Sequence, residues 1–302
     1  MTLLSDQTLP GTVDRTYHIQ IPATPPQAAL PVIIVFHGGG QDAATIARRW
    51  GVHPPNPVPP DLANYLLVFP EADPTLPDEW VHFSAGDSAF PTHDLDFVRQ
   101  LLQELTTRAY PTGSPDVPTV SADPSLAYAA GFSNGGGFVW QLLNSGLAAS
   151  FRGFAAVGKA LDPEKVRHYE NELAASGAAP APAPVVYVHG TADRGYRPPF
   201  TQEEMPSEQT LPFFTVQEML RRNGWPVPPP AAATTLVGGS TGLTEVVLQL
   251  FTGTEAFLQV TVINGGHNWP TPTTRGNPPV ANHFNATSAI VEFWRQHAGL
   301  PL

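Results

Sequence analysis

The 302-residue sequence contains no cysteine, few basic residues and no long apolar run. Without cysteine the chain has no disulfide, no thiolate metal site and no cysteine nucleophile, so any catalytic chemistry must come from serine, histidine and carboxylates. Fifteen basic residues against 26 acidic ones give a net charge of −11. That charge has the wrong sign for binding phosphate backbones, and we expect no nucleic-acid partner.

The apolar residues are numerous but spread along the chain. No stretch reaches the roughly 18 consecutive apolar residues of a membrane span, and we expect none. The start of the sequence lacks the basic residues and apolar centre of a secretory signal. Hydrophobic residues make up 42% of the chain, enough to bury the core of one large domain. We predict a single domain over residues 1–302, with loop insertions at 194–214 and 226–245.

Short apolar, β-rich runs alternate with helical patterns, which is typical of an α/β fold with a mostly parallel sheet covered by helices on both faces. The predicted strands are Thr16–Ile21, Val32–Phe36, Tyr65–Phe69, Leu126–Ala130, Phe154–Val157, Val185–His189, Val246–Leu250 and Phe257–Ile263. The predicted helices are Asp94–Arg108, Thr215–Arg222 and Ala286–His297, the last of them capped by Asn285.

The segment Gly131-Phe132-Ser133-Asn134-Gly135 matches the G-x-S-x-G pattern between a predicted strand and a helix. In such a nucleophile elbow the serine adopts a strained backbone, and its neighbours must lack side chains because strand and helix nearly touch. The alternative is a glycine-rich loop without catalytic function. The apolar strand before the motif and the helix after it favour the elbow, with Ser133 as the nucleophile and the N–H of Asn134 as an oxyanion donor.

A serine hydroxyl needs a base and an orienting carboxylate to become a nucleophile. Asp193 and His267 each follow a predicted strand, where an α/β sheet presents its functional side chains. The simpler alternatives are a turn-forming aspartate and a loop histidine. His93 with Asp94 and Asp96 resembles a metal cluster, but an acidic first helical turn explains these residues better, and we expect no metal and no cofactor.

A second oxyanion donor is expected in the loop after an early strand. The run His37-Gly38-Gly39-Gly40-Gln41 follows the predicted strand Val32–Phe36. Glycine N–H groups can approach a substrate oxygen closely, and we favour Gly39 over Gly40 or Gln41. A phosphate-binding loop is the alternative, but no lysine follows and the G-x-G-x-x-G spacing is not met.

Taken together, these motifs resemble the polyhydroxybutyrate depolymerase-like and feruloyl esterase-like branch of the α/β-hydrolase superfamily. The resemblance runs along nearly the whole chain, through the segments RTYHIQIP, VIIVFHGGG, LLVFPEA, HDLDFVRQLL, GFSNGGG, VVYVHGTAD, NGGHNWP and IVEFWRQHAG. It implies an α/β-hydrolase fold and a serine esterase with Ser133 as nucleophile, His267 as general base and acid, and Asp193 as orienting carboxylate. Gly39 and Asn134 would then form the oxyanion hole.

The resemblance also implies a substrate class: hydroxyalkanoate polyesters, aromatic polyesters such as polyethylene terephthalate, or feruloyl and aryl esters. Four aromatic residues near the motifs are candidates for an apolar acyl platform, although ordinary packing explains each as well: Trp80, Phe132, Tyr196 and Trp269. The expected partner is a small or polymeric ester, bound by a monomer, with secretion expected if the substrate is a polymer. An acetyl xylan esterase, an acyltransferase, a serine peptidase and a non-catalytic binding protein remain alternatives.

Overall fold

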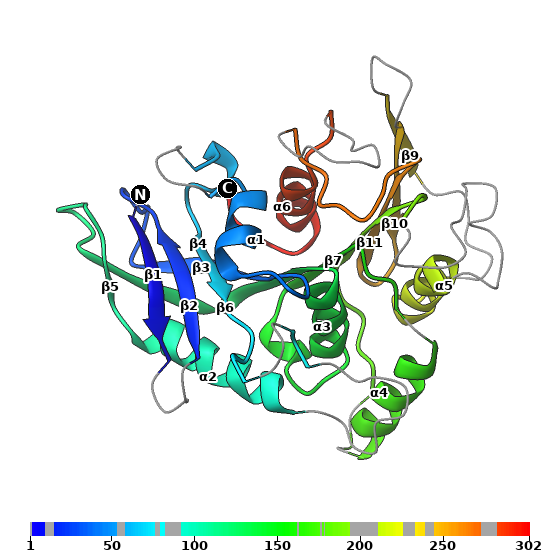
Figure 1. Ribbon diagram of the computed structural model, residues 1–302, viewed down its shortest axis with the longest axis horizontal. Coiled ribbons are helices and arrows are strands. Elements are labelled where there is room, and N and C mark those ends of the chain that lie inside the picture. Colours follow the sequence, from blue (N-terminus) through cyan, green and yellow to red (C-terminus); the bar gives the residue numbers. More distant parts are fainter. Residues whose placement is uncertain are drawn as a thin grey trace.

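Apolar strands form one twisted sheet through the middle of the molecule, with helices on both of its faces (Figure 1). This computed structural model describes residues 2–9, 15–52, 58–75, 79–81, 92–161, 163–175, 177, 179–193, 211–225, 233–238, 245–272 and 283–302. The strands are β1 (Thr2–Thr8), β2 (Thr16–Ile21), β3 (Ala29–Phe36), β4 (Leu66–Pro70), β5 (Tyr110–Pro111), β6 (Thr119–Phe132), β7 (Gly153–Val157), β8 (Val185–Gly190), β9 (Ala233–Gly238), β10 (Glu245–Thr252) and β11 (Ala256–Val262).

The strand order is β1-β2-β4-β3-β6-β7-β8-β11-β10-β9, with β5 paired to β6. The six central strands from β4 to β11 are parallel, and antiparallel pairs extend the sheet at both edges. Each strand predicted from the sequence lies in or overlaps an observed strand. The expected α/β class with a parallel centre is therefore confirmed, and the edge strands β1 and β9 are additions to it.

The helices are α1 (Ala43–Arg49), α2 (His93–Thr107), α3 (Asn134–Leu143), α4 (Pro163–Ala175), α5 (Leu211–Arg222) and α6 (Ala286–His297), with short 3₁₀ turns η1 (Pro60–Leu62) and η2 (Ala148–Ser150). The side chain of Asn285 accepts a hydrogen bond from the N–H of Ser288 at 3.3 Å, as expected for the cap of α6. In the described part of the chain, no helix is long and apolar enough to cross a membrane.

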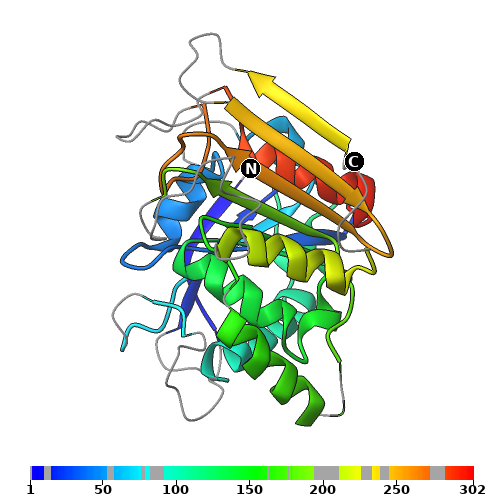
Figure 2. The same ribbon diagram turned by 90° about the vertical axis from the view of Figure 1, so that its right-hand side faces the viewer.

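Two apolar cores lie on the two faces of the sheet. Alternate residues of β3 separate between them: Val32, Ile34 and Phe36 join one core, and Ile33 and Val35 join the other. Helices α2, α3, α4 and α5 pack on the first face, and α1 and α6 on the second (Figures 1 and 2). A sheet buried on both faces explains why its central strands are continuously apolar.

The two predicted insertions are only partly described. Residues 194–210 lie outside the described residues, and α5 begins at Leu211, within the last part of the predicted 194–214 insertion. The middle of the 226–245 segment is the edge strand β9, while 226–232 and 239–244 lie outside the described residues. The single-domain assignment over 1–302 stays a prediction.

Candidate active site

Ser133 lies between the end of β6 and the start of α3, in a backbone conformation that residues other than glycine rarely adopt (φ 52°, ψ −116°). Its N–H donates a hydrogen bond to Val157 O at 2.8 Å, which fastens the turn to the neighbouring strand β7. A Cβ atom on Gly131 would lie 2.2 Å from Gly135 O, and one on Gly135 would lie 2.4 Å from His37 O. Strand, turn and helix are thus too close for side chains at these glycines.

His267 and Asp193 follow the carboxyl ends of two adjacent strands, β11 and β8. His267 Nε2 lies 2.7 Å from Ser133 Oγ, and His267 Nδ1 lies 2.7 Å from Asp193 Oδ2. The carboxyl group of Asp193 is fully buried, whereas His267 is partly open to solvent. The structure therefore brings these three side chains, which are far apart in the sequence, into one hydrogen-bonded chain.

The loops that carry Asp193 and His267 are bonded to each other. The N–H of Ala192 donates to Gly265 O at 2.8 Å, and the N–H of Asn264 donates to Thr191 Oγ1 at 2.7 Å. These cross-links fix the carboxylate relative to the imidazole independently of Ser133.

The hydrogen bonds define which imidazole nitrogen carries the proton. An ionised carboxylate only accepts hydrogen bonds, so His267 Nδ1 must donate to Asp193. Nε2 of the neutral ring is then the acceptor, and the Ser133 hydroxyl donates to it. This tautomer can remove a proton from the serine oxygen.

The loop after β3 is held by His37, which is buried. His37 Nδ1 lies 2.9 Å from Gly38 O and donates to it, while Nε2 accepts from the N–H of Ala72 at 3.1 Å. The N–H of Gln41 also donates to Gly38 O, at 3.1 Å. Since the C=O and N–H of a trans peptide point in opposite directions, this fixes the direction of the Gly39 N–H. Sequence patterns alone do not single out His37 beyond its place before the glycines.

Within the described part of the chain, the Gly39 N–H has no hydrogen-bond partner. Asn134 lies next to this loop, since its Cβ is 3.5 Å from the position that a Cβ on Gly39 would take. Asn134 is also the first residue of α3, directly after the serine. The two predicted oxyanion donors therefore belong to neighbouring residues beside Ser133.

A solved structure has a similar overall fold. The chain aligns with the acetyl xylan esterase from Aspergillus awamori at a TM-score of 0.52, with 12% identity over 88% of this chain and 94% of that one. The chain has the α/β-hydrolase fold. The chain is also 28% identical to "Putative esterase NocK" of Nocardia uniformis subsp. tsuyamanensis, over 88% of this chain and 74% of that protein.

A thermostable esterase aligns at a TM-score of 0.40 and 15% identity, over 73% of this chain but only about half (51%) of its own chain. No family model matches the sequence. The similarity to esterases that was inferred from the sequence motifs is confirmed by these comparisons.

The four predicted platform residues lie in different environments. Trp80 and Trp269 are each 1% exposed and Phe132 is 2% exposed, so none of these rings presents a free face to a substrate. Trp80 stacks on Phe138 of α3, with ring centroids 5.4 Å apart, and Trp269 donates from Nε1 to Thr287 Oγ1 at 3.1 Å. Tyr196 lies outside the described residues. The buried rings serve packing, which we infer to be their main role.

The ring of Phe132 packs beside His267. Its ring centroid lies 5.0 Å from that of His267, and the guanidinium carbon of Arg49 lies 4.2 Å from the same ring. Burial lowers the pKa of Arg49. The ring of Phe132 thus packs against both the imidazole of His267 and the guanidinium of Arg49.

A second histidine is buried near the candidate triad. Burial lowers the pKa of His189 from 6.5 to about 4, against an opposing effect of the Asp193 carboxylate. His189 is therefore neutral at pH 7. The imidazole that contacts both Ser133 and Asp193 is that of His267.

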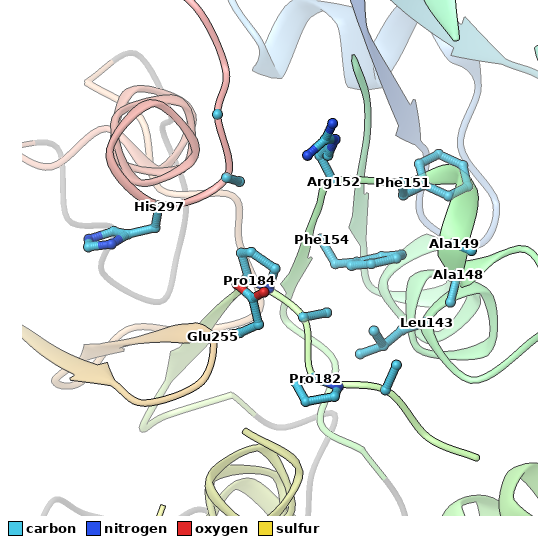
Figure 3. Close-up of a pocket in the computed structure, with 14 residues that line it drawn as sticks. Leu143, Ala148, Ala149, Phe151, Arg152, Phe154, Pro182, Pro184, Glu255 and His297 are labelled. Atoms are coloured by element: carbon cyan, nitrogen blue, oxygen red, sulfur yellow. The ribbon is translucent and has the colours of Figure 1, made fainter. Parts of the chain in front are cut away.

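A pocket of about 410 Å³ lies at the amino ends of β7 and β8. Figure 3 shows residues that line it. Its lining includes Arg152, just before β7, and Pro184, just before β8. Ser133 and Asp193 follow the carboxyl ends of their strands, whereas this pocket opens at the amino ends. It is separate from the candidate active site. In the described residues, no group of three or more potential metal ligands is gathered.

Proposed function

We propose that this α/β-hydrolase is a serine carboxylic-ester hydrolase in which Ser133, His267 and Asp193 form the catalytic triad. One observation carries the proposal: the two 2.7 Å contacts that link the serine hydroxyl through the imidazole to a buried carboxylate. The strained elbow and the oriented Gly39 N–H support it, because both are needed where negative charge develops on a carbonyl oxygen.

In the proposed reaction, Ser133 Oγ attacks the ester carbonyl carbon and its proton passes to His267 Nε2. The carbonyl oxygen becomes an oxyanion that accepts hydrogen bonds from the N–H groups of Gly39 and Asn134. The bond to the alcohol oxygen then breaks, and His267 returns the proton to the leaving alcohol. A water molecule then gives a proton to His267 Nε2 and attacks the acyl carbon. The bond to Ser133 Oγ breaks, His267 returns the proton to Ser133 Oγ, and the acid is released.

We further propose that the substrates are polyesters, of hydroxyalkanoate or aromatic type, or feruloyl and other aryl esters. The sequence motifs support this choice, and the buried rings of Trp80 and Trp269 do not add to it. An ester panel tests it: p-nitrophenyl acetate and octanoate, methyl ferulate, amorphous polyhydroxybutyrate film and an aromatic polyester film. Turnover of ferulate alone would remove the polyester proposal, and transfer of the acyl group to added alcohol in place of water would indicate an acyltransferase.

The variant Ser133→Ala tests the triad. We expect it to lower kcat for p-nitrophenyl acetate by about 10⁴-fold or more, with the fold retained. Ser150→Ala, in the 3₁₀ turn η2, is the matched control and should keep full activity. If Ser133→Ala kept more than a few per cent of the turnover, the assignment of the nucleophile would be wrong.

A further inference from the structure

The backbone around Trp80 is attached to the residue that follows the nucleophile. Trp80 N–H donates to Asn134 Oδ1 at 2.7 Å, and Asn134 Nδ2 donates to Trp80 O at 3.2 Å. The N–H of Val81 donates to the buried carboxylate of Asp94 at 2.6 Å. With the Trp80 ring in the core, these bonds hold the 79–81 segment firmly beside the site.

Glu79 begins this fixed segment, and its side chain is exposed. Glu79 Oε1 lies 2.9 Å from the position that a Cβ on Gly39 would occupy, and Asn134 Cβ lies 3.5 Å from the same position. The carboxylate therefore stands against the two residues whose N–H groups are proposed to bind the oxyanion. It can come this close because residue 39 has no side chain.

The charge of Glu79 has no counter-ion among the residues that the structure describes. Across the described ranges, its carboxylate forms no hydrogen bond and no ion pair. The Arg15 guanidinium, 5.8 Å from the Trp80 ring centroid, is bonded to Asp94 at 2.8 Å. A negative charge without a counter-ion at the edge of the site acts on any charged group that a substrate brings there.

We propose that Glu79 is a specificity-determining residue that selects esters by charge: it favours esters with a cationic group close to the scissile bond and disfavours those with an anionic group. The inference rests on the proposed function, since it presumes that the ester carbonyl is bound at Gly39 and Asn134. The overall charge of −11 also favours cationic over anionic substrates. Because Glu79 lies next to the oxyanion donors, its effect should exceed that of any other single exposed carboxylate.

Three thioesters of similar size isolate the effect of charge: acetylthiocholine is cationic, 3,3-dimethylbutyl thioacetate is its neutral counterpart, and S-acetyl-3-mercaptopropionate is anionic. Each releases a thiol, which can be detected with a thiol reagent without background because the protein has no cysteine. The measured quantity is the ratio of kcat/KM for the cationic ester to that for the anionic ester. Inhibition of p-nitrophenyl acetate turnover by the same three compounds gives a parallel ratio from inhibition constants.

We expect Glu79→Gln to lower this ratio by about 10-fold, and Glu79→Lys to lower it further, as estimated from Coulomb interactions over several ångströms near a solvated surface. High salt should reduce the ratio in the wild type more than in Glu79→Gln. Glu172→Gln, on the exposed side of α4, removes the same charge elsewhere and should leave the ratio within about two-fold.

The two proposals fail in different ways. An unchanged ratio in both Glu79 variants, with the neutral thioester still hydrolysed, would overturn the role of Glu79 and leave the esterase proposal intact. An equal decrease in Glu172→Gln would also overturn it, because the effect would then be one of net charge. Full activity of Ser133→Ala toward the neutral thioester would overturn the esterase proposal itself.

Discussion

His37 provides a sharp test of how the oxyanion loop is positioned, because its two ring nitrogens have separate tasks. Nδ1 donates to Gly38 O and directs the Gly39 N–H, whereas Nε2 accepts from Ala72 N–H and serves stability. In His37→Asn, the side-chain amide can place its nitrogen near the position of Nδ1. In His37→Gln, the amide oxygen can reach the position of Nε2. The two variants therefore separate the two tasks.

For His37→Asn we expect a loss of about 1–3 kcal/mol in the free energy of unfolding, the cost of leaving the buried Ala72 N–H without an acceptor. Its kcat should stay within a few-fold of wild type. For His37→Gln, Gly38 O keeps the bond from Gln41 N–H, so the stability loss should be about 1 kcal/mol. Its kcat should fall by about 10- to 100-fold, less than the 10²–10³-fold seen when an oxyanion donor is removed outright.

The assay is kcat and KM for p-nitrophenyl acetate, with urea unfolding of the same samples. KM should change little in His37→Gln, because the misdirected N–H matters most in the transition state. If kcat in both variants fell in proportion to stability, or if His37→Gln kept wild-type kcat, the role of His37 in directing Gly39 would be refuted.

Two further predictions concern stability. Burial lowers the pKa of His189 from 6.5 to about 4. Between these pH values His189 is protonated in the unfolded chain and neutral in the folded one. The free energy of unfolding should therefore fall by up to about 3 kcal/mol from pH 7 to pH 4. Urea unfolding at pH 7, 5 and 4 checks this, and an equally steep decrease in His189→Phe would contradict it. Gly135→Ala should cost about 3 kcal/mol or more, since its Cβ would meet His37 O at 2.4 Å, whereas Gly146→Ala, with open space around it, should be nearly neutral. Melting temperatures of the two glycine variants compare them directly, and similar values would show that the elbow is looser than described.

The sequence was informative where burial on both faces imposes apolar runs. The central strands, such as β3 and β8, were predicted for that reason. The edge strand β1, with the sequence TLLSDQT, and helix α4, with many charged residues, have weak patterns and were not predicted. Antiparallel edges and solvated helices need less apolar surface, so composition alone does not reveal them.

The candidate site shows the same division. The residues after β6, β8 and β11 were selected from motif and strand position, and the structure brings them together. The direction of a side chain does not follow from its position in the sequence. The backbone of Trp80 is bonded to Asn134 beside the site, but its ring turns into the core, while Glu79 faces Gly39. Such choices depend on tertiary packing that a local pattern does not encode.

The bonds between the Thr191–Asp193 and Asn264–Gly265 loops have a consequence for redesign. Strand β8 leads into the loop that carries Asp193, and the adjacent strand β11 leads into the loop that carries His267. Hydrogen bonds join these two loops directly. Exchanges in the intervening chain that keep α5, which packs in the core, and β9, which pairs with β10, should therefore leave the spacing between acid and base unaltered. New substrate preferences should be easiest to graft onto this part of the scaffold.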